Sequence, residues 1–291
     1  MPELPEVQTT VSGLDRVLRG LVIIDAWTDY GSRYFHGSDN IKNPSYFKVF
    51  RKKVRNAKIT HVTRRAKNIL IHLSGNQIIL VHMKMTGHML YGDYDRKDPF
   101  NRFIHLIINL SNGKTLELCD ARKFAKVTLV DTDTISETIH LKGIGPEPLE
   151  EDFTFKAFNE RIFKKPQGKI KPVLLDQTII AGIGNIYSDE SLWRAGIHPE
   201  QPVKTIPEKK LKELYSAIRI TLLKGIDFGG DSMSDYRNID GKPGKFQEQH
   251  RAYRKTGTSC SKKGCRGKIA RTVVTGRGTH FCDAHQKLIS K

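Results

Sequence analysis

The second residue of the chain could act as a nucleophile. Pro2 precedes Glu3, and removal of Met1 would leave the secondary amine of Pro2 at the chain terminus. An α-amino group has a pKa near ~8, so part of it is unprotonated at neutral pH and can attack a sugar carbon to form an iminium ion. Glu3 and Glu6 lie within one helical turn and could act as general acid or base. On these residues alone, an ordinary helix start is the commoner explanation.

Four residues near the C-terminus form a candidate zinc site. Cys260, Cys265, Cys282 and His285 are separated by four, sixteen and two residues. Two close ligand pairs joined by a hairpin suit tetrahedral zinc, which accepts thiolate and imidazole together. The polar sequence around them could not easily build its own core, so bound metal would contribute folding free energy. The alternative is three incidental cysteines and a surface histidine.

A glycine-rich turn at 182–185 (Gly-Ile-Gly-Asn) could hold a phosphate. It lacks the third glycine of a dinucleotide-binding loop, and no first strand of a βαβ unit precedes it. Between two helices, its backbone N–H groups and the amide of Asn185 could bind phosphate oxygens. An ordinary inter-helix turn is the default reading of this motif.

The composition favours a polyanionic partner. Lys and Arg number 49 against 31 Asp and Glu, a formal net charge of +18. Residues 251–291 hold eleven Lys and Arg but one acid, Asp283. Counterion release from phosphates would supply affinity for nucleic acid, although ribosomal and membrane-surface proteins are equally basic. No apolar run approaches the ~20 residues that span a bilayer, and no signal segment is evident, so we expect a cytoplasmic chain with reduced cysteines.

The hydrophobic pattern predicts a helix, then strands, then further helices. Apolar residues recur at helical spacing from Leu4 to Leu18, and from 21 to 130 the period falls to two. Strands are expected at 59–62, 69–73, 78–82, 103–110, 115–118 and 124–130, with a hairpin at Asn112-Gly113. The segment 143–148 (Gly-Ile-Gly-Pro-Glu-Pro) predicts a linker, and helical patterns follow at 155–162 and 211–222.

Several short motifs together resemble the formamidopyrimidine-DNA glycosylase family. They are 2–7 (Pro-Glu-Leu-Pro-Glu-Val), 64–67 (Arg-Arg-Ala-Lys), 184–187 (Gly-Asn-Ile-Tyr) and 276–282 (Gly-Arg-Gly-Thr-His-Phe-Cys). They occur in the family's order along the whole chain. The resemblance implies a monomeric, bifunctional DNA glycosylase and AP lyase that acts on double-stranded DNA containing damaged bases and carries one structural zinc ion.

The resemblance also implies an α+β multidomain fold. A catalytic β-sandwich domain with flanking helices would cover 2–135, followed by an interdomain linker at 136–150. A helix–two-turn–helix DNA-binding domain would cover 151–250 and include a lesion-capping loop at 229–246. A zinc-finger β-hairpin would occupy 251–291, and DNA would lie across the cleft between the two domains.

Catalytic roles carry over from the same resemblance. Pro2 corresponds to the family's Schiff-base nucleophile and Glu3 to its acid at the sugar, with Glu6 as a second candidate acid or base. Lys67, expected in a strand, corresponds to the lysine assigned to β-elimination. Arg277 corresponds to the arginine that grips the phosphates beside the lesion and is assigned to δ-elimination.

Further positions correspond to DNA contacts. Asn185 and Lys171 match phosphate-binding residues of the family. Met85, Arg122 and Phe124 match side chains that fill the gap left by the flipped nucleotide, which offsets the cost of unstacking. By periodicity alone, Met85 and Phe124 would be ordinary core residues of strands.

The expected substrates are oxidised guanine and ring-opened purines. The loop 229–246 resembles the capping loop of the purine-specific branch, and Leu4 argues against the endonuclease VIII branch, which typically begins Pro-Glu-Gly-Pro. Two alternatives stay open: an endonuclease VIII-like glycosylase for oxidised pyrimidines, and a non-catalytic, zinc-dependent protein that binds lesions without cutting.

The sequence departs from the family pattern at three places. The zinc finger has four residues between its first two cysteines, and His285 stands where the family usually has cysteine. Residues 120–124 read Asp-Ala-Arg-Lys-Phe instead of Asp-Pro-Arg-Arg-Phe. Phe103 stands where members often place a DNA-contacting histidine, whose contact would be lost or taken over by Arg102 or His105.

Overall fold

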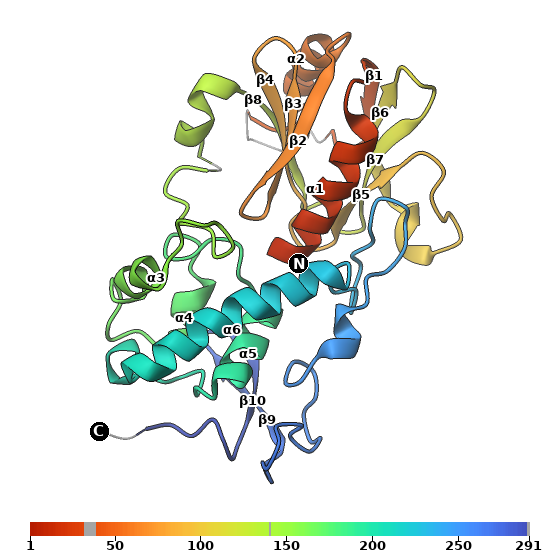
Figure 1. Ribbon diagram of the computed structural model, residues 1–291. Coiled ribbons are helices and arrows are strands. Elements are labelled where there is room, and N and C mark those ends of the chain that lie inside the picture. Colours follow the sequence, from red (N-terminus) through yellow and green to blue (C-terminus); the bar gives the residue numbers. More distant parts are fainter. Residues whose placement is uncertain (32–38, 140, 290–291) are drawn as a thin grey trace. The chain divides into compact units, whose positions relative to one another are not determined.

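The computed structural model describes residues 1–31, 39–139 and 141–289, which form two compact units (Figure 1). The first unit comprises Met1–Lys142 and Phe228–Gln247, and the second comprises Gly143–Asp227 and Glu248–Lys291. Small parts of the expected sandwich domain, linker and zinc finger, at 32–38, 140 and 290–291, lie outside the described residues.

The first unit is built on two four-stranded antiparallel sheets. One has the strand order β1-β6-β7-β5, made of Ile23–Thr28, Ile104–Leu110, Thr115–Asp120 and Gly87–Tyr91. The other has the order β2-β3-β4-β8, made of Ile59–Arg65, Asn68–Leu73, Gln77–His82 and Lys126–Asp131. Helices α1 (Leu4–Leu18) and α2 (Pro44–Val54) belong to the same unit.

One hydrophobic core joins both sheets and both helices. Val7 and Leu14 of α1 and Phe50 of α2 are buried in the same cluster as Leu118 of one sheet and Ile79 of the other. The apolar face predicted from Leu4 to Leu18 is therefore the face that α1 buries. This helix runs from the N-terminus across the unit and packs against β2.

Every strand expected from the period-two pattern is present, with ends that differ by at most three residues. The Asn112-Gly113 hairpin is confirmed between β6 and β7, where Gly113 has a φ of 78°. Strands β1 and β5 and helix α2 were not expected; in β5, Gly87 and His88 leave an apolar run of only three residues.

Two expected placements were wrong. Lys67 lies in the turn between β2 and β3, not in a strand, because Ala66 has a φ of 53° and ends the ladder. Phe124 lies in the turn between β7 and β8, where Lys123 likewise has a φ of 53°.

The second unit is helical and ends in a hairpin. Its helices are α3 (Phe155–Ile162), α4 (Ile170–Leu175), α5 (Asn185–Ala195) and α6 (Glu208–Asp227), and its strands are β9 (Ile269–Val274) and β10 (Arg277–Cys282). Helix α5 packs against α6 and against β10. The helices predicted at 155–162 and 211–222 are confirmed as α3 and the middle of α6. Short 3-10 turns occur at Pro99–Arg102, Thr132–Glu137, Val203–Thr205 and Phe246–Gln249.

The segment predicted as a linker is held on the second unit. At 143–148 the backbone of Gly145 donates to the carbonyl of Gln177 at 2.8 Å, and the carbonyl of Pro146 accepts from Ala181 at 2.9 Å. The segment contains no helix, as its glycines and prolines predicted.

Candidate functional site

The N-terminal residues Pro2, Glu3 and Glu6 are buried at the start of α1. Glu3 is the N-cap residue: the backbone N–H of Glu6 donates to its side chain, while the Glu6 carboxylate accepts the N–H of Glu3 at 2.7 Å. This capping box satisfies two backbone donors that a helix start leaves without partners. It also fixes both carboxylates within one turn of Pro2.

The turn that carries Lys67 is fixed to the same helix. Arg64 donates through Nε to the Gln8 side chain on α1 at 2.9 Å and through Nη1 to the carbonyl of Ala66 at 3.1 Å. The side chain of Asp15 accepts the N–H of Val62 at 2.8 Å. Lys67 itself is only 6% exposed. The structure thus brings the turn bearing Lys67 against α1, the helix that begins directly after Pro2 and Glu3.

Glu6 also anchors the loop 229–246, the expected lesion-capping loop. Its second carboxylate oxygen accepts the N–H of Asp231 at 2.7 Å, and its carbonyl accepts the Tyr236 hydroxyl at 3.0 Å. Burial raises the pKa of Tyr236, so this hydroxyl stays a donor. Gly230 has a φ of 85°, and a Cβ there would meet the Glu6 side chain at 3.0 Å, so only glycine fits.

The rest of this loop, expected within the domain 151–250, packs in the first unit instead. Arg237 pairs with Asp98 at 2.7 Å, and the Asn101 amide donates to the carbonyl of Gly241 at 3.0 Å. The side chain of Asn101 also contacts His88, whose ring Nε2–H donates to Asn101 Oδ1 at 3.0 Å. Burial lowers the pKa of His88 to about 4, so it is neutral at pH 7.

The three expected gap-filling side chains are exposed on two neighbouring turns. Met85 lies in the turn between β4 and β5, and Arg122 and Phe124 lie in the turn between β7 and β8. Met85 is 40% and Phe124 47% exposed, so neither is the core residue that periodicity suggested. The Arg122 guanidinium lies 4.4 Å from the centre of the Phe124 ring. Two apolar side chains and one cation therefore project into solvent together.

In the second unit, Asn185 contacts the residue that follows Arg277. Asn185 is the first residue of α5, and its amide Nδ2 donates to the carbonyl of Gly278 at 3.1 Å. Its Oδ1 is buried and accepts from no described group. Arg277, the first residue of β10, is exposed. The turn predicted between α4 and α5 is confirmed.

Lys171 is placed differently from a surface phosphate contact. Its side chain and that of Asp189 are both 0% exposed, with Nζ 2.6 Å from Asp189 Oδ1. Nζ also donates to Thr279 Oγ1 at 2.8 Å and to the carbonyl of Gly278 at 3.3 Å. The other oxygen of Asp189 accepts the N–H of His280 at 2.9 Å. This buried pair ties β10 to α4 and α5.

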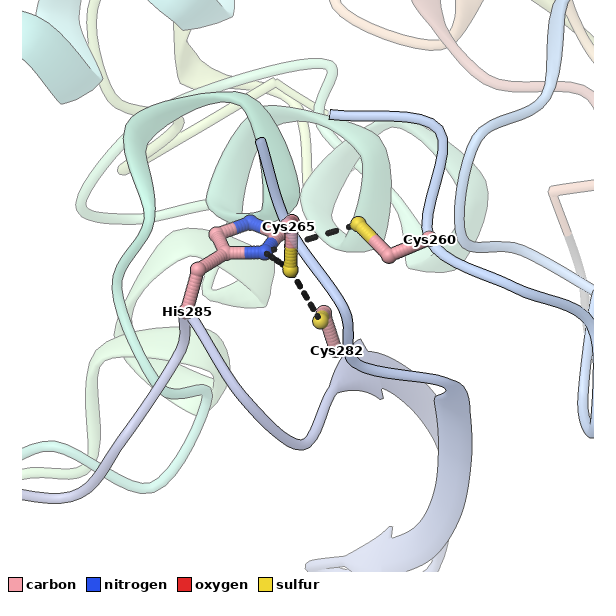
Figure 2. A group of neighbouring side chains, drawn as sticks. All are labelled: Cys260, Cys265, Cys282 and His285. Carbon is pink, nitrogen blue, oxygen red and sulfur yellow. Dashed lines mark hydrogen bonds between the residues drawn. The ribbon is translucent and has the colours of Figure 1, made fainter. Parts of the chain in front are cut away.

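The four candidate zinc ligands converge (Figure 2). The ligand atoms of Cys260, Cys265, Cys282 and His285 all lie within 4.8 Å of one another. His285 Nδ1 faces the sulfurs of Cys260 and Cys265 at 3.5 Å, and its Nε2 lies 3.1 Å from the carbonyl of Trp193. The carbonyl of Trp193 orients the ring with Nδ1 toward the sulfurs, because a metal-bound histidine commonly donates its other ring N–H to such a carbonyl. Burial lowers the pKa of His285, which favours the neutral, ligating imidazole.

The position usually occupied by histidine carries no polar group. The Phe103 ring lies 4.8 Å from the Arg102 guanidinium, which is exposed. His105, the other candidate substitute, is engaged with Asp29 at 2.7 Å. Of the two, Arg102 is therefore the side chain that is open to solvent.

Sequence reasoning missed the buried acids that hold these groups in place. Asp189 and Asp120 read as ordinary helix and strand residues, and Glu190 accepts backbone N–H groups from Arg251, Ala252 and Tyr253 at 2.8–2.9 Å. Burial raises the pKa of Glu190. The only signal in the sequence is an acid inside an apolar element, which does not reveal its partners.

Among the described helices, none is long and apolar enough to cross a membrane.

Comparison with known proteins agrees over the whole chain. Residues 1–127 match the formamidopyrimidine-DNA glycosylase N-terminal domain family, and residues 144–237 match the formamidopyrimidine-DNA glycosylase H2TH domain family. The formamidopyrimidine-DNA glycosylase of Pelotomaculum thermopropionicum is 38% identical and aligns over 99% of this chain and 100% of its own length. That of Bacillus subtilis is 36% identical over 97% of this chain and 98% of its own.

Solved structures show the same similarity. The complex between the Lactococcus lactis Fpg and an abasic site-containing DNA superposes with a TM-score of 0.83 at 35% identity, covering 96% of this chain and 97% of that one. MutM in complex with carbocyclic 8-oxo-G containing DNA superposes with a TM-score of 0.82 at 36% identity, covering 97% and 98%.

Proposed function

The chain belongs to the formamidopyrimidine-DNA glycosylase family, and we propose that it excises oxidised purines from duplex DNA and then cleaves the abasic strand. The observation that carries this function is similarity along the entire length to glycosylases, including proteins solved on abasic-site and 8-oxo-G DNA. Neither alternative is favoured, because the same relatives match both the catalytic N-terminus and the helical domain.

Pro2 is the proposed nucleophile. With Met1 removed, its neutral secondary amine attacks C1′ of the damaged nucleotide, and the bond from C1′ to the base breaks as the base leaves with a proton. The sugar ring then opens to give an iminium ion between Pro2 and C1′. The position of Pro2 directly before the buried Glu3 supports this role, since an acid then lies next to the amine.

Glu3 is the proposed acid at the sugar. Its carboxyl group, held by the N–H of Glu6, lies one residue from the amine and, in its protonated form, could deliver the proton that ring opening requires. Glu6 has both oxygens engaged, one on the N–H of Glu3 and one on the N–H of Asp231. Its proposed contribution is therefore to hold Glu3 and the capping loop together, while a direct acid or base role stays a prediction.

Strand cleavage follows from the iminium ion. Loss of a C2′ proton and of the 3′ phosphate is β-elimination, and loss of a C4′ proton and of the 5′ phosphate is δ-elimination. Lys67, held beside α1 by the Arg64 bridge, is the proposed participant in the first step. Arg277, exposed at the start of β10, is proposed to bind the phosphates beside the lesion and to assist the second. Water finally hydrolyses the iminium and frees Pro2.

The zinc finger is proposed to hold one structural zinc ion. Three thiolates and one imidazole form a donor set that closes a tetrahedral site, and the four ligand atoms already converge. Bound metal would fix the hairpin that presents Arg277, without taking part in the chemistry. Asn185, whose amide contacts Gly278 beside Arg277, is the proposed second phosphate ligand. We further propose a monomer that works on DNA in the cytoplasm.

A substrate panel tests this function. Duplexes carrying 8-oxoguanine, ring-opened guanine or thymine glycol would be incubated with the native enzyme, and single-turnover excision rates compared. We expect the two purine lesions to be excised faster. Faster excision of thymine glycol would support the endonuclease VIII-like alternative, and binding without excision of any lesion would support a non-catalytic protein.

A further inference from the structure

Two turns of the first unit carry the three exposed side chains that we assign to the gap in the DNA. Met85 is followed by Thr86, and Arg122 and Phe124 follow Asp120. The turns belong to different connections between the two sheets, one from β4 to β5 and one from β7 to β8. Nothing in the sequence indicates what keeps them in register with each other.

One buried carboxylate joins the two turns. Asp120 is 0% exposed. Its Oδ1 accepts the Thr86 hydroxyl and, at 3.3 Å, the N–H of Arg122. The Thr86 hydroxyl in turn accepts the same N–H of Arg122 at 3.2 Å. The residue after Met85 and the backbone of Arg122 are therefore linked through Asp120 Oδ1.

The other oxygen of Asp120 closes the far side of the second turn. Asp120 Oδ2 accepts the N–H of Ala125 at 2.7 Å and the hydroxyl of Tyr30 at 3.0 Å. The single carboxylate of Asp120 thus holds the backbone N–H of Arg122 and that of Ala125, the residue after Phe124. Burial, and then the charge of Asp120, raises the pKa of Tyr30, so this hydroxyl remains a donor at neutral pH.

The local backbone needs such support. Lys123, between the two gap-filling residues, has a φ of 53°, a conformation that residues other than glycine adopt at a cost. Ala121 stands where the family that the chain resembles has proline, so the turn lacks that stiffening. A buried carboxylate with four donors is a strong, directional anchor, because hydrogen bonds to a charged acceptor are shorter and stronger than neutral ones.

We propose that Asp120 is the positioning residue of the gap-filling group: it sets Met85, Arg122 and Phe124 in one arrangement before DNA binds. Asp120 touches no substrate and acts through the two turns, with Thr86 and Tyr30 as its partners. The inference rests on the proposed gap-filling role of those three side chains. The inference adds that the three side chains fill the gap efficiently because they are ordered before DNA binds. Side chains that had to be ordered on binding would lose part of their binding free energy.

Asp120→Asn tests the anchor most directly. The amide keeps the shape but replaces one acceptor oxygen by a donor, which cannot face the N–H of Arg122 or Ala125. We expect about a tenfold slower single-turnover excision of 8-oxoguanine from duplex DNA, the effect of one lost charge-assisted hydrogen bond. Cleavage of an abasic site in single-stranded DNA should change less than about twofold, because no gap has to be filled there.

A tyrosine pair supplies matched variants if Asp120→Asn fails to fold. Tyr30→Phe removes a hydroxyl from Asp120, and Tyr94→Phe removes a buried hydroxyl that donates to Glu117 at 2.6 Å, on the same strand β7 but away from both turns. Both variants should lose similar thermal stability. Only Tyr30→Phe should slow duplex excision and reduce the fluorescence change of a 2-aminopurine placed opposite the lesion. Equal effects of the two variants on excision would overturn the positioning role.

Phe124→Ala, measured beside them, separates the two proposals. We expect it to slow duplex excision by about 5- to 100-fold and to leave single-stranded abasic cleavage nearly unchanged. If Phe124→Ala behaves so while Asp120→Asn and Tyr30→Phe match the native enzyme, the positioning inference is wrong and the gap-filling role stands. If Phe124→Ala loses the same factor on both substrates, the gap-filling role itself is wrong, and the positioning inference falls with it.

Discussion

The buried pair of Lys171 and Asp189 gives a prediction whose size follows from the structure. Lys171→Met removes the cation and leaves a fully buried carboxylate with only the N–H and ring of His280 as partners. Removing one member of a buried ion pair costs about 3–5 kcal/mol, while replacing both members by apolar residues is often nearly neutral. We therefore expect Lys171→Met to lower the free energy of unfolding by that amount and the double variant Lys171→Met/Asp189→Leu to recover most of it.

DNA affinity should not recover with stability. Both variants lose the contacts of Lys171 to Thr279 and to the carbonyl of Gly278, which set the peptide between Asn185 and Arg277. Urea unfolding and fluorescence anisotropy with an abasic-site duplex at several salt concentrations would measure the two quantities. Lys169→Met is the matched control, since Lys169 pairs with Glu200 at the surface, where an ion pair contributes about 0–1 kcal/mol.

A different result would identify the other role predicted for Lys171. If it contacts a phosphate directly, Lys171→Met should leave the free energy of unfolding unchanged and reduce the salt dependence of binding by about one phosphate. That pattern would refute the buried-pair explanation. Recovery of native DNA affinity by the double variant would also refute it, because the hairpin would then be set without these contacts.

Three further predictions concern the catalytic residues, the metal and pH. Glu3→Gln should abolish base excision but reduce cleavage of a ready-made abasic site less strongly, whereas Lys67→Ala should slow both reactions. Gel assays measure both rates. Native rates for both variants would show that neither residue belongs to the site. Purified protein should contain one zinc ion per chain when its metals are measured by mass spectrometry, and a metal content near zero would contradict the assignment. In a chelator competition, His285→Cys should bind zinc at least as tightly as the native protein, because a thiolate restores the commoner ligand set. His88 has a pKa of about 4 in the folded protein and near ~6.5 in the unfolded chain, so the unfolded chain takes up the proton first as the pH falls. The free energy of unfolding should therefore decrease as pH falls from 6.5 toward 4, by about 2 kcal/mol between pH 7 and 5. His88→Gln should lose that part of the dependence in urea unfolding at the two pH values; an unchanged dependence would show that His88 is not the group responsible.

Local patterns predicted the elements but not the contacts that fix the site. The apolar runs at 69–73 and 78–82 and the helical spacing from Leu4 to Leu18 were sufficient to place β3, β4 and α1. Strand β5 was missed because Gly87 and His88 shorten its apolar run to three residues. The two turns bearing Lys67 and Phe124 read as strand because the left-handed φ of Ala66 and Lys123 leaves no trace in residue type.

The site residues were predicted from motifs, and their surroundings were not. The zinc ligands converge as their spacing predicted, since a short hairpin brings its ends together. The burial of Lys171 could not be predicted, because it depends on Asp189 and Thr279, which lie 18 and 108 residues away in the chain. The packing of 229–246 in the first unit likewise depends on Glu6, a residue more than 200 positions earlier.

The central claim is that the amine of Pro2 forms a covalent intermediate with the damaged sugar. Native enzyme would be incubated with an 8-oxoguanine duplex and sodium borohydride, which reduces the iminium ion to a stable amine. Peptide mapping of the trapped complex should place the DNA on the N-terminal peptide, through Pro2, with Met1 absent. An adduct on Lys67, or excision that proceeds without any trapped complex, would contradict the account.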